Sequence, residues 1–102
     1  MKERRARVRF NEVTPTTKSV LIGRRGEKVV AFEFRNEGDN STVSFKKDGA
    51  GVSLLPNEEK PYAVDGLAYF EEQFTVIFEA IIPANPYTHK AIVTEIYHKE
   101  NV

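Results

Sequence analysis

Apolar and polar residues alternate with a period of two along several short segments of the chain. The pattern covers residues 5–13, 28–36, 42–47 and 73–82. A longer run, residues 87–98, has apolar residues at both odd and even positions. Successive side chains of a strand point to opposite faces, so the period-two segments predict half-buried strands. The two-sided run predicts a central strand.

The same alternation predicts which side chains of each strand lie together. At the N-terminus it separates Arg5, Arg7 and Arg9, which we expect on the solvent face, from an apolar set that we expect to face the core. Four apolar sets are expected to be buried in this way: Ala6, Val8 and Phe10; Val30, Phe32 and Phe34; Val43 and Phe45; and Phe74, Val76 and Phe78.

Turn-forming residues separate these segments at short intervals, and strand-forming residues dominate the composition. Val and Ile number seventeen against four Leu, a bias toward β-branched side chains that favours strands over helices. Many short strands joined by regular turns are typical of antiparallel all-β folds. We therefore predict a single domain, residues 1–102, that forms an antiparallel β-sandwich, or a partly open barrel, of about seven or eight strands.

One segment departs from the strand pattern. Leu67, Phe70 and Phe74 stand at positions i, i+3 and i+7, and Asp65 precedes them as a possible helix cap. This spacing predicts a single helical turn between residues 65 and 74.

Composition excludes several classes of protein. The chain has 102 residues, no cysteine and a formal net charge of zero. Without cysteine there are no disulfides and no cysteine-ligated metals. No apolar run approaches the ~18 residues of a membrane span, and no signal peptide is visible, so we expect no membrane association and a cytoplasmic location.

The zero net charge hides an asymmetry along the chain. Residues 1–28 hold nine Lys or Arg and three Asp or Glu, whereas residues 29–102 hold six Lys or Arg and twelve Asp or Glu. The two segments therefore carry charges of +6 and −6. Opposite charges can be satisfied within one subunit or between neighbouring molecules.

The arginine row allows three interpretations. Arg5, Arg7 and Arg9 on a strand would be spaced by roughly 6.6 Å, and Arg24 and Arg25 follow at the next turn. The row is a solvated edge that deters aggregation, a docking site for carboxylates of a partner protein, or a nucleic-acid-binding arm. The neutral overall charge argues against nucleic-acid binding.

Candidate catalytic and ion-binding residues are few. His89 and His98 are nine residues apart, an odd spacing that places them on opposite faces of a regular strand and away from a common metal. Asp39, Asn40 and Asp48 match no calcium-loop spacing. We predict no catalytic residue, no metal and no cofactor.

The turn Gly23–Gly26 is a candidate phosphate cradle, because its backbone N–H groups and two guanidinium groups lie close together in the sequence. It lacks the lysine and the following Ser or Thr of a P-loop, and no helix pattern follows it. A tight hairpin loop is the prediction for this segment.

One segment has a recognisable rhythm of strands and turns. FEFRNEGDNSTVSFKKDGAGVSLLPNEEKPYAV, residues 32–64, resembles the small β-sandwich accessory proteins of tailed-phage virions, and equally some immunoglobulin-like adhesion modules. The chain lacks the cysteines and tryptophan of antibody-type domains. The virion resemblance implies a structural role in many copies on a capsid or tail, with no catalytic residue to carry over.

Together these patterns predict a non-enzymatic subunit that docks onto a larger protein assembly, such as an auxiliary protein of a phage capsid. The expected partner-binding residues are Arg5, Arg7, Arg9, Arg24 and Arg25. One alternative is a carbohydrate-binding module that uses Tyr62, Tyr69, Tyr87 or Tyr97, and another is a small metal-dependent barrel enzyme.

Overall fold

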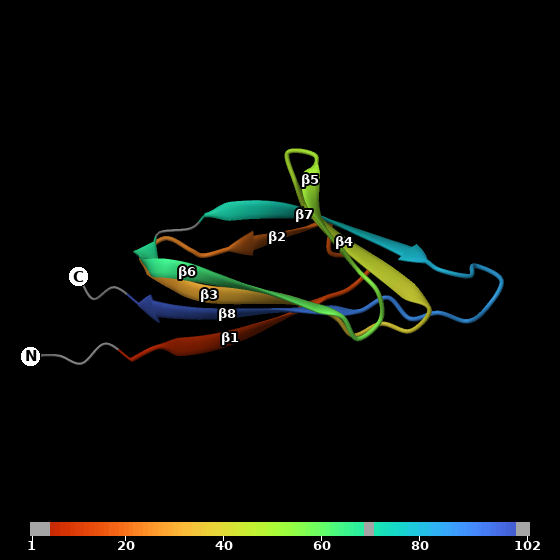
Figure 1. Ribbon diagram of the computed structural model, residues 1–102, viewed down its shortest axis with the longest axis horizontal. Helices are drawn as coiled ribbons and strands as arrows, with labels where there is room; N and C mark the ends of the chain where they lie inside the picture. Colours follow the sequence, from red (N-terminus) through yellow and green to blue (C-terminus); the bar gives the residue numbers. More distant parts are fainter. Residues whose placement is uncertain (1–4, 69–70, 100–102) are drawn as a thin grey trace, which may run out of the picture.

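The chain folds into two four-stranded antiparallel sheets that pack face to face (Figure 1). The computed structural model describes residues 5–68 and 71–99. One sheet has the strand order β1-β8-β3-β6 and the other β2-β7-β4-β5. The predicted all-β sandwich of about eight strands is confirmed. The strands are β1 (Arg7–Val13), β2 (Ser19–Ile22), β3 (Glu27–Asn36), β4 (Ser41–Lys47), β5 (Ala50–Leu54), β6 (Glu59–Ala68), β7 (Glu72–Ala80) and β8 (Ala91–Lys99).

Aromatic side chains from the two sheets meet at the centre of the sandwich. Phe34 of β3 stacks on Phe45 of β4 with ring centroids 4.2 Å apart, and both rings are fully buried. Phe74 of β7 packs edge-on against Phe34 at 5.2 Å. Such pairs contribute roughly 0.5–1.5 kcal/mol beyond the burial of their area. The predicted inward sets of β4 and β7 are confirmed, since Val43 and Val76 are also buried.

Strand β8 is central, as the two-sided pattern predicted. It pairs with β1 on one side and with β3 on the other. Residues 87–90 of the predicted run lie before the strand, in the connection that follows β7. Strands β1 and β2 are consecutive in the chain, yet each forms an edge of a different sheet.

A β-bulge in β3 changes one predicted face. The register with β6 and β8 shifts between Val29 and Ala31, so that Val29 takes a fully buried position and Val30 is only half-buried. An extra residue in one strand reverses the faces on one side of the bulge. Phe32 and Phe34 are buried as predicted, but Val30, which was expected on the same buried face, is only half-buried.

The predicted helical turn is wrong where the structure describes it. Asp65 and Leu67 belong to β6, which continues to Ala68, and Phe74 belongs to β7. Phe70 lies outside the described residues. No helix long and apolar enough to cross a membrane occurs in residues 5–68 and 71–99.

Candidate interaction surfaces

The faces of β1 are the reverse of those predicted. Ala6 is exposed, Val8 is 54 % exposed and Phe10 is 71 % exposed, whereas the Arg9 side chain is only 15 % exposed. The prediction that these apolar residues face the core is therefore wrong. The strand prediction itself is right, because Arg7 and Arg9 share one face of an extended segment. That face turns toward the other sheet.

Arg9 enters a network of charged and polar groups inside the sandwich. Its terminal nitrogens donate to both carboxylate oxygens of Glu27 at 2.9 Å, and its Nε donates to Glu95 Oε2 at 2.9 Å. Asn11 Nδ2 donates to the same Glu95 oxygen at 2.8 Å, and the backbone N–H of Gly23 donates to Glu95 Oε1 at 2.7 Å. The carboxylates that meet Arg9 thus belong to its own chain, which removes Arg9 from the predicted partner-binding set.

This buried network is stabilised by complete pairing. Glu95 is fully buried, and a buried carboxylate is tolerated only when it is paired and hydrogen-bonded. The guanidinium of Arg9 also lies 4.4 Å from the centre of the Tyr97 ring. The hydrogen bonds that Arg9 donates lower the pKa of the Glu27 carboxyl, and acceptance of these bonds by Glu27 and Glu95 raises the pKa of Arg9. The network ties β1, β3, β8 and the turn after β2 together.

The other four predicted arginines are exposed. Arg5, Arg7, Arg24 and Arg25 make no ion pair within the part of the chain that the structure describes. Their role in partner binding stays a prediction.

The turn that holds Arg24 and Arg25 joins two sheets. Gly23 and Gly26 both adopt a φ of 82°, a left-handed conformation that suits glycine, and Glu27 N–H donates to the Arg24 carbonyl at 3.0 Å. The segment connects β2 of one sheet to β3 of the other, so the predicted tight loop is confirmed but the hairpin is not.

The outward side of the β1-β8-β3-β6 sheet is an apolar surface that the sequence analysis missed. Val8 pairs with Ile96, Ile96 with Ala31, and Ala31 with Ala63, so one apolar row crosses all four strands. Phe10 lies in the next row, opposite Thr94. We call this surface the outer face; it comprises Val8, Phe10, Ala31, Glu33, Pro61, Ala63, Ile92, Thr94 and Ile96.

A shallow hollow of about 250 Å³ lies on the outer face, lined in part by Ala31, Pro61 and Ile96. Glu33 stands beside it. Desolvation, with the nearby Glu59 carboxylate, raises the pKa of Glu33. A carboxylate in a largely apolar surface is easier to protonate than one in water, because burial disfavours its charged form.

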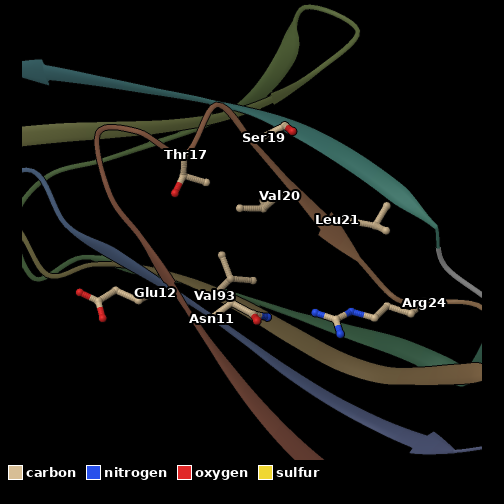
Figure 2. A pocket seen from close by; sticks show the side chains of 8 residues that line it. All are labelled: Asn11, Glu12, Thr17, Ser19, Val20, Leu21, Arg24 and Val93. Atoms are coloured by element: carbon tan, nitrogen blue, oxygen red, sulfur yellow. The ribbon is translucent and has the colours of Figure 1, made fainter.

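A cleft of about 300 Å³ opens between β1 and β2 (Figure 2). Asn11 and Glu12 line it from β1, and three consecutive residues, 19–21, line it from β2. Val20 and Val93 point into the cleft, and Arg24 extends its guanidinium group into it from one end. The cleft therefore has an apolar floor and a cation at one end.

The two histidines lie in different surroundings. His89 precedes β8, and its Nδ1 lies 2.6 Å from Ser41 Oγ, while His98 lies near the end of β8. Ser41 is fully buried, so this contact does not present an accessible nucleophile. No cluster of three or more His, Asp or Glu that could hold a metal ion occurs among the described residues.

The candidate calcium ligands do not come together. Asp39 and Asn40 precede β4 and Asp48 follows it, so the seven residues of the strand separate them. Asn40 instead fixes the connection after β7: its side-chain amide donates to the carbonyls of Ile82, Asn85 and Pro86, and its Oδ1 accepts from the N–H of Ile82.

The described tyrosines form no common surface. Tyr62 stacks on Phe32 at 4.7 Å, Tyr97 lies beneath Arg9, and Tyr87 is half exposed beside His89 in the connection before β8. Tyr69 lies outside the described residues. A carbohydrate platform of converging tyrosines therefore has no support from these three positions.

No protein-family model matches the chain, and no curated protein does either. The fold and its surfaces define an eight-stranded antiparallel β-sandwich with one apolar outer face and one cleft between edge strands.

Proposed function

We propose that the protein is a non-enzymatic structural subunit that docks onto a larger protein assembly through its outer face. The observation that carries this proposal is the exposure of Val8 and Phe10, 54 % and 71 %, beside the apolar row of the sheet. Isolated exposed apolar residues are ordinary, but a continuous apolar patch on a soluble fold marks an interaction surface.

The charges around the outer face define the partner's chemistry. Arg35 lies within 3.3 Å of carboxylate oxygens of Glu37 and Glu59, and Lys90 lies 3.7 Å from Glu12. Glu33 lies beside the apolar hollow, where desolvation and the Glu59 carboxylate raise the pKa of its carboxyl. A matching partner is a flat apolar protein surface, against which Glu33 docks in its neutral form. Four exposed arginines lie away from this face: Arg5, Arg7, Arg24 and Arg25. Their charges would raise the rate at which the subunit associates with its partner more than they would raise the affinity of the complex.

The assembly that we propose is a virion. Residues 32–64 resemble accessory proteins of tailed-phage particles, and the +6 and −6 segments of the chain suit docking in one orientation. In this role the subunit occupies many equivalent positions on a capsid or tail protein.

The experiment is quantitative mass spectrometry of purified particles of the phage that encodes the chain. We expect the wild-type chain at a fixed stoichiometry, and its loss from particles that carry the Val8→Ser, Phe10→Ser double variant. The matched control is Ile81→Ser, Ile82→Ser, which alters residues of similar exposure, 46 % and 51 %, in another region. Absence of the wild-type chain from particles contradicts the virion assignment, and equal retention of both variants contradicts docking through the outer face.

A further inference from the structure

We propose that the cleft between β1 and β2 binds an extended, carboxylate-bearing segment of a partner protein as an added strand. This site lies between the sheets, and the outer face lies on the opposite side of β1, so the inference does not depend on docking through that face.

The borders of the cleft are the free edges of two strands. In their sheets β1 pairs with β8 and β2 with β7, and each is the last strand of its sheet. Consecutive residues of both strands line the cleft, which shows that it runs along strand edges rather than over one face of a sheet. An edge strand leaves alternate backbone N–H and C=O groups unpaired, and an extended peptide pairs with them. The four residues of β2 offer an edge of about 13 Å.

The side chains of the cleft suit a segment with alternating character. Val20 and Val93 form an apolar floor, while Thr17 adds a hydroxyl group at the rim (Figure 2). In an extended peptide, alternate side chains point to opposite sides. One set of side chains therefore packs on the floor while the other faces water.

Arg24 supplies the charge selectivity. Its guanidinium extends into the cleft and makes no hydrogen bond or ion pair with the described residues. The nearby carboxylates of Glu27 and Glu95 are already bound by Arg9, and the Asn11 amide is bound by Glu95. The charge of Arg24 helps to lower the pKa of Glu27, but the two groups form no ion pair, so the planar guanidinium of Arg24 is available to bind a carboxylate through two hydrogen bonds.

Two hydrogen bonds order the backbone of the turn that holds Arg24. Gly23 N–H donates to Glu95 at 2.7 Å, and Glu27 N–H donates to the Arg24 carbonyl at 3.0 Å. Both bonds anchor the turn on either side of Arg24. A turn that is already ordered loses less backbone entropy when the exposed Arg24 side chain binds a ligand.

The test uses the blocked peptide acetyl-Val-Thr-Val-Thr-Glu-amide, titrated into ¹⁵N-labelled protein and followed by NMR. We expect saturable shifts of backbone amides in β1 and β2. Replacing the peptide's Glu with Gln, or Arg24 with Ala, should weaken binding about tenfold, because each change removes a charge-assisted pair. Arg25→Ala is the matched control, since Arg25 is exposed in the same turn but does not line the cleft.

Several outcomes would overturn the proposal. They are the absence of saturable shifts at millimolar peptide, equal affinity for the Glu and Gln peptides, or shifts confined to other strands. A dimer of the free chain that Arg24→Ala dissociates would show that the occupant is a second copy rather than a partner segment. The Val8→Ser, Phe10→Ser variant should bind the peptide normally, which separates failure here from failure of docking through the outer face.

Discussion

Strand β1 presents two chemically opposite faces, and its neighbours match each of them. On the side toward the other sheet, Arg9 and Asn11 bond the carboxylate of Glu95 from β8. On the opposite side, Val8 and Phe10 pair across the strand with Ile96 and Thr94. Arg9 and Asn11 of the polar face find their partners within the chain, whereas the apolar face has no covering layer in the described structure.

The difference shows that complementarity between strands decides which face is internal. An arginine is stable inside a sandwich when neighbouring strands supply carboxylates in hydrogen-bonding geometry. An apolar face is stable outside when it is part of a binding surface. The following predictions test this contrast between the two faces of β1.

The largest effect is expected from Arg9→Ala. It leaves the fully buried Glu95 without its cation, and breaking such a pair typically destabilises a fold by about 3–5 kcal/mol. Urea unfolding measures the loss. Arg7→Ala, on the same face but exposed, should change the free energy of unfolding by less than about 0.5 kcal/mol. Equal effects of the two substitutions would show that Arg9 has no special role.

A smaller effect is expected from Glu27→Gln. Arg9 lowers the pKa of Glu27 in the folded chain, so the stabilisation is present above the ordinary carboxyl value of 4.5 and is lost as pH falls through the lowered folded value. At pH 7 the substitution should cost about 1.5–3 kcal/mol, since it removes charge-assisted hydrogen bonds. Chemical unfolding as a function of pH should show this difference shrinking in acid. A difference that stays constant to pH 2 would contradict the pairing.

Docking should respond to the ionisation of Glu33. Its pKa is raised, and covering it with an apolar partner further disfavours the charged form, so docking should tighten as pH falls through that value. Glu33→Gln should remove this dependence and strengthen docking about threefold to tenfold at pH 7. Affinity measured between pH 4 and 8 tests this, and tighter docking at higher pH would contradict it.

The smallest effect on stability is expected from Val8→Ser combined with Phe10→Ser. Both side chains are more than half exposed, so the free energy of unfolding should change by less than about 1 kcal/mol. Thermal or urea unfolding provides the measurement. A loss of several kcal/mol would mean that these residues belong to the core.

The strand pattern of the sequence was sufficient for the fold class but not for the faces of β1. A period of two places Arg9 and Phe10 on opposite faces of the strand but does not determine which face is internal. Hydrophobicity alone predicted that Phe10 would be internal, which is wrong. The missing information was non-local, because Glu27 and Glu95 lie 18 and 86 residues from Arg9.

A signal for the outer face was present but incomplete. Apolar residues on both faces of the predicted run, residues 87–98, correctly indicated a central strand, and they also imply that its outward side, with Ile92 and Ile96, needs a cover. The bulge at Val29 and Ala31, which aligns Ala31 with Ile96, has no local sequence signal. The cleft could not be predicted from the sequence either, because it forms only when β1 and β2 belong to different sheets.

The absence of cysteine allows one direct test of docking through the outer face. Phe10→Cys places a single thiol on that face, and Ala50→Cys places a control thiol at an exposed position of β5. The rate of maleimide labelling is measured for each variant, free and in the native particle. We predict similar rates in the free chains and at least about tenfold slower labelling at position 10 alone in the particle, since a covered interface excludes solvent. Equal labelling at position 10 in both states would contradict docking through this face.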